Sequence, residues 1–262
     1  QKTVIKVPRL WWTLIYKGGC IFGIGFSIPG IIEHANNKHI ISFSPSLHFD
    51  NWNFSDLGDH WKFPYIIDND ANFGGFYEAW GTNDSFAYLN IAGGVGGAIV
   101  LNGNQFFGNS NATAEFGHMV IAPEGERCNC GKRGCLEKYI STNVLSENLN
   151  ISLEDFFSSL EKGNNVYRKI FDTYLTSLCI GISNIRLVLG LEVVVADEIT
   201  EYLSPYEALI QKKIRKMNKF ENKQYFRFSK NKKENSSSTA AALKTITIYI
   251  ENFINTINNY SE

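Results

Sequence analysis

Four residues close together in this 262-residue chain could bind a metal ion: His118, Cys128, Cys130 and Cys135. One imidazole and three thiolates form one of the usual ligand sets of structural zinc. Turn-forming glycines lie in the same stretch, at Gly125, Gly131 and Gly134. The protein would fill all four positions of the metal, so the pattern predicts a structural zinc and not a catalytic one. The alternative, four unliganded side chains, is uncommon for clustered cysteine and histidine with turn glycines.

Two carboxylates, Glu115 and Glu137, bracket this loop. His118 would use one ring nitrogen for zinc, which fixes the direction of its other N–H. Closing the metal loop should bring both carboxylates towards one place. Together with Asn69 and Asp70 they would form a patch of hydrogen-bonding groups that suits a neutral polyol such as a sugar. Asn69 or Asp70 could equally be no more than the N-cap of the helix that follows.

These side chains need a framework, and hydrophobic patterning predicts one. Strands are expected at residues 21–27, 65–67, 86–92, 98–101, 192–196 and 224–229. Helices are expected at residues 71–80, 152–163, 165–189, 206–218 and 239–257. Residues 31–61 are polar and aromatic, which favours a long surface connection with a short helix at residues 54–60. Strands and helices alternate in the second half, which predicts α/β layers.

Local signals refine this framework at three places. The glycine run at residues 93–97 could admit a phosphate, but it lacks the Lys-Ser/Thr of a P-loop, and a bulged strand explains it equally well. Asn102-Gly103 between apolar runs predicts a tight hairpin turn. Cys179 is far from the other cysteines and is expected to be a small core residue.

Composition and charge exclude several classes of protein. The net charge is -1, which gives no overall reason to expect a nucleic-acid partner. No stretch approaches the length of a membrane-spanning helix, and no signal peptide is visible, so we expect a cytoplasmic protein with no membrane partner. Five cysteines, three of them within eight residues, suit a reduced compartment and a metal better than a disulfide framework.

The metal stretch also resembles a family. Glu115-x-Gly117-His118, followed by Cys128-x-Cys130-Gly131-x-x-Gly134-Cys135-Leu136-Glu137, resembles the ROK family of sugar-responsive repressors and sugar kinases. Three further stretches match it: Gly23-Ile24-Gly25 with Pro29-Gly30, Asn69-Asp70-Ala71-Asn72 with Glu78, and Gly94-Val95-Gly96-Gly97. The resemblance implies the actin-like (ribonuclease-H-like) two-lobed sugar-kinase fold of α/β class, with a zinc-binding loop at residues 115–137. We expect a partial first lobe at residues 1–80, lacking its first strands, and a second lobe at residues 81–262.

The resemblance also implies roles for individual residues. The residues implied to contact the sugar are Asn69, Asp70, Glu115, His118 and Glu137. The residues implied to hold zinc are His118, Cys128, Cys130 and Cys135. In the family kinases, the residue that matches Asp70 is the general base that activates the sugar hydroxyl. The family's tendency to form dimers makes a homodimer the expected assembly.

The chain departs from the family kinases on the nucleotide side. They open with an Asp-x-Gly-Gly-Thr phosphate loop, which has no counterpart here, and they carry Gly-Thr-Gly where this chain has Ala92-Gly93-Gly94. Their Gly-Gly pair after the late strand is replaced by Asp197-Glu198, whose charges would repel ATP, and their Gly-Ala-Ala by Thr239-Ala240-Ala241. With the sugar side intact, these losses favour a sensor that does not use ATP.

We therefore predict the sugar-sensing, effector-binding domain of a ROK-type transcriptional regulator, closest in look to the xylose-responsive repressors. Family repressors carry a winged helix-turn-helix before the sugar domain. None is recognisable in this chain, so DNA would be contacted only through a part outside it. The alternative is an enzyme, an ATP-dependent, glucokinase-like sugar kinase with Asp70 as general base. A third hypothesis is a scaffold held by zinc, with an empty sugar pocket.

Overall fold

The computed structural model describes residues 11–17, 20–35, 38–44, 47–58, 60–61, 63–109, 112–218, 224–231 and 236–259. Two compact units make up the chain. The first comprises Gln1–Tyr77, Phe107–Ala112 and Glu234–Glu262, and the second comprises Glu78–Phe106 and Thr113–Lys233. The expected lobe division between residues 80 and 81 stays a prediction. The C-terminal residues, which that division assigned to the second lobe, pack within the first unit.

The first unit contains a three-stranded sheet of order β1-β2-β6. The strands are β1 (Trp11–Lys17), β2 (Cys20–Ile28) and β6 (Tyr65–Asn69). β1 runs antiparallel to β2, and β6 runs parallel to it. The expected strands at residues 21–27 and 65–67 are confirmed, and α2 (Asp70–Glu78) follows β6 directly, as the predicted helix at residues 71–80 required.

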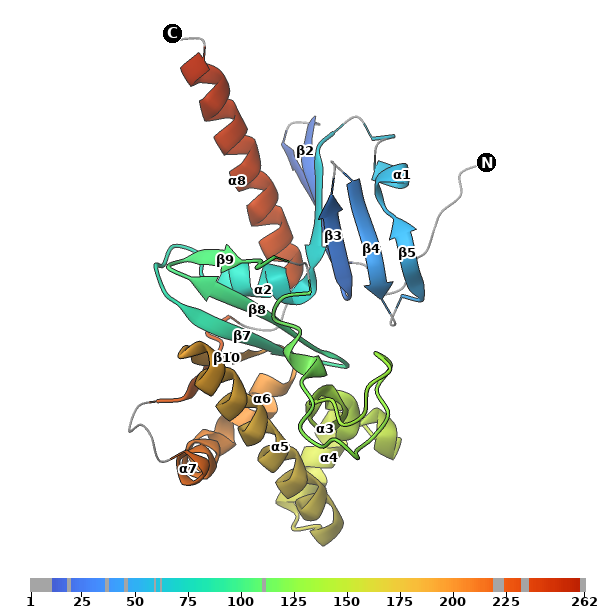
Figure 1. Cartoon of the computed structure of the whole chain (residues 1–262), viewed down its shortest axis with the longest axis vertical. Helices are drawn as coiled ribbons and strands as arrows, with labels where there is room; N and C mark the ends of the chain where they lie inside the picture. Colours follow the sequence, from blue (N-terminus) through green and yellow to red (C-terminus); the bar gives the residue numbers. More distant parts are fainter. Residues whose placement is uncertain are drawn as a thin grey trace. The chain divides into compact units, whose positions relative to one another are not determined.

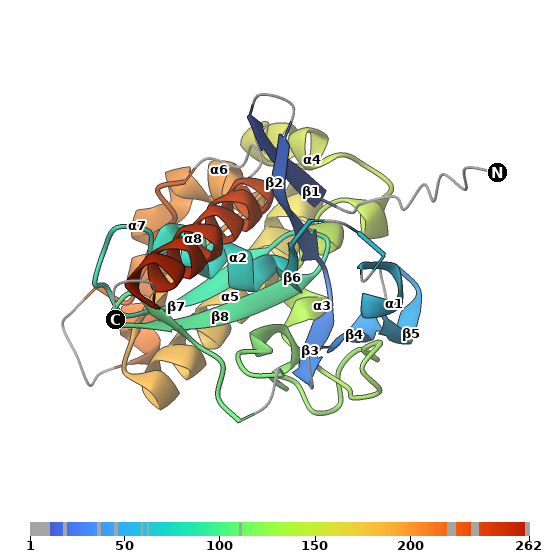
Figure 2. The same cartoon turned by 90° about the horizontal axis from the view of Figure 1, so that it is seen from above.

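One long helix, α8 (Ser236–Asn259), covers a face of β2 in the first unit. Figures 1 and 2 show α8 running beside this strand. The approach is close because β2 presents glycines: a Cβ added to Gly25 would lie 2.7 Å from the Cβ of Ala241, and one added to Gly23 would lie 2.6 Å from Thr245. On the other face of the sheet, Ile28 and Ile67 join a second apolar cluster.

The prediction of a surface connection at residues 31–61 was wrong. These residues form a three-stranded antiparallel sheet, β3 (Ile31–Ala35), β4 (Lys38–Ser44) and β5 (Phe49–Asn53), before α1 (Ser55–Gly58). The segment looks polar because its exposed residues are interleaved with inward-facing ones. Ile41 and Phe54 are fully buried there.

The second unit is built on a five-stranded sheet of order β11-β10-β7-β8-β9. β7 (Phe86–Ile91), β10 (Glu192–Ala196) and β11 (Phe226–Phe228) are parallel. β8 (Val95–Leu101) and β9 (Asn104–Phe106) are antiparallel, and Asn102 and Gly103, both in the left-handed conformation, form the predicted hairpin turn between them. Every residue of β7 is buried, as expected of a central strand.

Helices cover one face of this second sheet (Figure 1). The α-helices are α3 (Glu137–Ile140), α4 (Leu153–Glu161), α5 (Asn165–Leu189), α6 (Ile199–Leu203) and α7 (Glu207–Met217). Short 3-10 turns lie at Phe116–His118, Thr142–Val144, Glu147–Leu149 and Ser204–Tyr206. Within the described residues, no helix has both the length and the apolar character needed to cross a bilayer.

The longest of these helices, α5, has the bounds that the sequence predicted. The side chain of Asn164 caps its N-terminus, and Gly190, with φ of 68°, ends it. Its apolar face, including Tyr174, packs into the core, and Cys179 is fully buried there. The core thus fixes the helix that the metal loop rests on.

Candidate functional site

The four expected metal ligands lie together in the second unit. One ligand atom from each of His118, Cys128, Cys130 and Cys135 lies within 4.8 Å of the others. The Nδ1 atom of His118 is 3.6 Å from the Sγ atom of Cys128, and the Sγ atoms of Cys130 and Cys135 are also 3.6 Å apart. Tetrahedral zinc with Zn–S bonds of about 2.3 Å separates its ligands by about 3.8 Å. The donor set and its spacing therefore fit a zinc ion.

The backbone of the loop explains why these ligands meet. Two short antiparallel bridges, Val120 with Cys135 and Arg127 with Arg133, close the loop on itself. Two of the expected turn glycines have positive φ, 89° at Gly131 and 71° at Gly134. A Cβ at Gly134 would also collide with the backbone oxygen of Ala122. Gly134 is therefore required twice, for its conformation and for its lack of a side chain.

The thiols differ in the ease with which they ionise. Burial raises the pKa of Cys135 to about 12 and also raises the pKa of Cys128. Burial raises the pKa of Cys130 too, but hydrogen bonds with the Lys132 backbone and with the neighbouring thiols outweigh it, and the net shift is downward. A bound cation would supply the charge that holds all three as thiolates, so metal binding here should release protons.

His118 faces two groups at once. Its Nδ1 atom points at the thiol cluster, and its Nε2 atom lies 3.9 Å from a carboxylate oxygen of Glu115. The two side chains are only partly exposed, 20% for His118 and 29% for Glu115. An imidazole that binds metal through Nδ1 keeps a proton on Nε2. One ring nitrogen of His118 therefore faces the thiols and the other faces Glu115.

Glu137 and the Glu115–His118 segment meet at the same strand. A carboxylate oxygen of Glu137 accepts a hydrogen bond from the backbone N–H of Val95, at 3.0 Å. A Cβ at Gly117 would collide with the backbone oxygen of Val95, and one at Gly97 would collide with the ring of Phe116. Gly97, the last residue of the glycine run, thus serves close packing of β8 against the metal loop. This contact explains Gly97 without a bound phosphate.

Asn69 and Asp70 belong to the first unit, whereas Glu115, His118 and Glu137 belong to the second. The side-chain oxygen of Asn69 accepts from the backbone N–H groups of Ala71 and Asn72, at 2.8 and 3.3 Å, so Asn69 caps α2. Its amide donates to the backbone oxygen of Gly30 at 2.7 Å. Capping accounts for Asn69 locally, and its part in sugar contact stays a prediction, as does that of Asp70.

The turn after β10 keeps a conformation that favours glycine although it contains none. Asp197 has φ of 75°, in the left-handed region. Its backbone oxygen accepts from the N–H and hydroxyl groups of Thr200, at 3.0 and 2.7 Å. A carboxylate therefore stands in a turn whose backbone conformation glycine adopts most readily.

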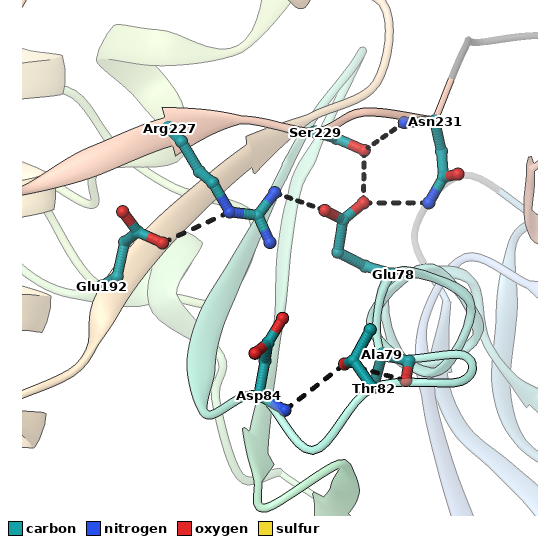
Figure 3. A network of polar contacts seen from close by, with 8 residues as sticks. All are labelled: Glu78, Ala79, Thr82, Asp84, Glu192, Arg227, Ser229 and Asn231. Atoms are coloured by element: carbon teal, nitrogen blue, oxygen red, sulfur yellow. Dashed lines mark hydrogen bonds and ion pairs between the residues drawn. The ribbon is translucent and has the colours of Figure 1, made fainter.

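Figure 3 shows a polar network that sequence reasoning missed. The buried carboxylate of Glu78 accepts from Arg227, from the hydroxyl of Ser229 at 2.6 Å and from the amide of Asn231 at 2.9 Å. Arg227 also pairs with Glu192 at 3.2 Å. The sequence marks Glu78 only as a match to the family pattern. Its three partners lie about 150 positions further along the chain, so no local pattern connects them to Glu78. The network fixes the segment that follows β11.

Comparisons with known proteins agree with this geometry. A family model described as "ROK family" matches residues 15–246. The xylose repressor of Bacillus subtilis (strain 168) is 34% identical over 137 residues, which cover 49% of this chain and 34% of that protein. The glucokinase of Halalkalibacterium halodurans is 36% identical over 132 residues, which cover 48% of this chain and 39% of that protein. The chain thus spans little more than a third of the length of these relatives.

A solved structure supports the same fold. A ROK hexokinase from Thermus thermophilus superposes with a TM-score of 0.72 at 21% identity, and the match covers 87% of this chain and 79% of that one. The expected actin-like arrangement of mixed α/β units is confirmed at the level of fold. The incompleteness of the first lobe stays a prediction.

Proposed function

Because this chain belongs to the ROK family, we propose that it is the sugar-sensing part of a ROK-type transcriptional regulator. Its effector would be a monosaccharide, and DNA would be bound by a part outside this chain. The family contains both repressors and sugar kinases, so the proposal depends on the nucleotide side of the molecule.

The observation that carries the sensor function is Asp197. It keeps the left-handed backbone of a glycine turn but adds a carboxylate to it. Beside a nucleoside triphosphate, the carboxylates of Asp197 and Glu198 would add electrostatic repulsion where a kinase needs positive or neutral groups. A sensor has no such need, so the substitution would be tolerated there.

The metal loop is proposed to hold the sugar contacts in place. His118, Cys128, Cys130 and Cys135 would bind one structural zinc ion, which supplies rigidity and no activated water. His118 would then direct its Nε2–H, and Glu115 and Glu137 their carboxylate oxygens, to hydroxyl groups of the sugar. Asn69 and Asp70 would complete the contacts. Carboxylate and imidazole groups are suited to a neutral polyol because hydroxyls both donate and accept.

Signalling would follow from differential affinity. A sugar shifts a conformational equilibrium only as far as it binds one state more tightly than the other. A homodimer would pass this shift to the DNA-binding part. In this scheme the chain needs to bind sugar but not to transform it.

Two measurements test the proposal. Xylose or glucose at about 100 times its dissociation constant should stabilise the fold by about 2.7 kcal/mol, seen as a higher thermal midpoint. ATP with the same sugar should release no ADP above background. Steady ADP release that disappears in Asp70→Asn would overturn the sensor function in favour of a kinase.

A matched pair of variants separates sugar contact from metal support. Glu115→Gln should abolish the thermal response to sugar while elemental analysis still finds one zinc per chain. The control is Glu33→Gln on the exposed edge of β3, which should change neither. A Glu115→Gln variant that keeps the full response to sugar would remove Glu115 from the proposed site.

The kinase is the second candidate function, because Asp70, the first residue of α2, matches the residue that acts as general base in the family kinases. The two candidates differ in one outcome, sugar-dependent turnover of ATP. A chain that binds neither sugar nor ATP would instead support a zinc-held scaffold.

A further inference from the structure

A cavity of about 350 Å³ lies within the first unit. None of its lining residues is among those assigned to metal or sugar. Its apolar wall comes from five side chains: Ile66, Ile67, Phe73, Phe107 and Ile248. The volume falls in the range of small-molecule sites and exceeds about twofold the cavity of about 150 Å³ that holds a benzene molecule. A ligand of one or two rings would fit.

A fixed ion pair forms one polar part of the cavity wall. The Nζ atom of Lys244 lies 3.2 Å from a carboxylate oxygen of Asp68. Asp68 is buried, and its other oxygen accepts from the Asn69 backbone at 2.8 Å and from the Asn72 amide at 2.7 Å. The Lys244 ammonium also lies 5.5 to 5.6 Å from the ring centres of Phe73, Phe76 and Phe107. The pair adds no net charge to the cavity.

Two imidazoles form the other polar part. His34 on β3 and His39 on β4 are register partners, and their Nδ1 atoms are 2.8 Å apart. In a neutral pair one Nδ1 donates and the other accepts, so one outer nitrogen is an acceptor and the other an N–H donor. Desolvation lowers the pKa of His34, with a smaller upward effect from Asp68 and a downward one from Lys244. Desolvation therefore favours the neutral form of His34.

We propose that this cavity binds a small neutral ring compound that carries a hydroxyl group, of the phenol class. The apolar wall suits the ring, and the imidazole pair matches a hydroxyl, which donates and accepts at once. A charged ligand would have to give up its hydration in a cavity whose ammonium group, on Lys244, is already paired with Asp68. The proposal is independent of the sugar-sensing function, because no residue is shared.

Acid should change the preference of the cavity. Protonation of one imidazole makes both outer nitrogens donors and gives the cavity a positive charge. Among the described residues, the charged and titratable groups recorded around the pair include Asp68, Lys244 and, against the His39 ring, Tyr65. A ring carboxylate should therefore bind weakly at pH 8 and more tightly at pH 5.5, whereas phenol binding should weaken or stay constant.

The test uses fluorine NMR with the full chain and three probes: 4-fluorophenol, fluorobenzene and 4-fluorobenzoate. At pH 8, the fluorine resonance of 4-fluorophenol should broaden on binding. Fluorobenzene should bind about tenfold more weakly because it lacks the hydroxyl. Absence of 4-fluorophenol binding at millimolar concentration overturns the proposal. Equal binding of fluorobenzene, or tighter binding of 4-fluorobenzoate at pH 8, overturns the phenol class.

Variants locate the site. Ile248→Trp should fill the cavity and abolish 4-fluorophenol binding, whereas Ile250→Trp, on an exposed position of the same helix outside the cavity, should leave it unchanged. Unchanged binding in a folded Ile248→Trp places the probe elsewhere and overturns the proposal. Should that variant fail to fold, His34→Leu at the exposed rim gives a second readout. His34→Leu should weaken the binding of 4-fluorophenol about tenfold and leave the binding of fluorobenzene unchanged. Any other pattern contradicts the role of the imidazole pair.

Discussion

Two turns at the same edge of the second sheet differ in the residues that form them. β7 and β10 are parallel neighbours, so the glycine turn after β7 and the Asp197 turn after β10 leave the sheet at the same edge. The first turn keeps its glycines, and the second carries a carboxylate. The difference has a physical cause in what each position touches.

The strand that follows the glycine turn, β8, is constrained by contact with the metal loop. Gly97 and Gly117 have no room for a Cβ, because Phe116 and Val95 lie against them. Any side chain there would separate the metal loop from β8. At Asp197 the constraint is a positive φ, which aspartate tolerates better than most residues. A conformational requirement is thus easier to meet by substitution than a steric one.

Metal removal should have the largest effect, because four side chains of the metal loop would lose their shared ligand at once. Chelation, or Cys135→Ser, should lower the thermal midpoint by about 10 °C or more, since structural zinc contributes much of the stability of its loop. The measurement is calorimetry with elemental analysis. Cys179→Ala is the control, and it should keep the zinc because Cys179 lies in the core away from the cluster. A chain with no zinc and an unchanged midpoint would contradict the metal assignment.

Two glycines in the metal loop separate steric from conformational requirements. Gly134→Ala should cost about 3 kcal/mol or more, because the added Cβ collides with the Ala122 backbone in addition to the strain of positive φ. Gly131→Ala should cost only about 1 kcal/mol, because Gly131 has positive φ but an added Cβ would meet no described atom within 4 Å. Urea denaturation measures both. Equal losses would remove the distinction drawn between the two turns.

The Asp197 turn should tolerate glycine but be destabilised by a β-branched residue. Asp197→Gly should change the free energy of unfolding by no more than about 0.5 kcal/mol, because relief of positive φ is offset by greater freedom of the unfolded chain. Asp197→Val should cost about 1 to 2 kcal/mol, because a β-branched residue is strained there. Denaturation of the two variants in parallel is the measurement. A large loss in Asp197→Gly would mean that the carboxylate has a structural role, and the positive φ would not be the main constraint on this turn.

The smallest expected effect is a pH dependence away from both turns. The pKa of His34 is lower in the folded protein than its ordinary value of about 6.5, so the unfolded chain binds the proton more readily. The contribution of His34 to the free energy of unfolding is fully present above this ordinary pKa and is lost as the pH falls below it. In metal-stripped protein, His34→Gln should reduce the slope of stability against pH between about 5 and 6.5. An unchanged slope would assign the titration to other groups.

Sequence reasoning recovered most of the elements and the metal cluster. The helix at residues 165–189 was recognisable because its apolar period and its caps are local features. The three-stranded sheet at residues 31–53 was not, because its polar exposed face hides short strands among aromatic residues. The partners of Glu78 were not recognisable either, since nothing local marks Ser229 or Asn231 as ligands of a carboxylate.

The sequence alone determined the family and the candidate metal donors, because four possible ligands within eighteen residues and their turn glycines are set by short-range spacing. Only the tertiary structure decided which nitrogen of His118 faces the thiols, that the glycine run packs against the metal loop, and that α8 covers β2. It also decided that His34 and Lys244 line one cavity. Each of these depends on contacts between residues distant in the chain, and such contacts are fixed by packing and not by any local pattern.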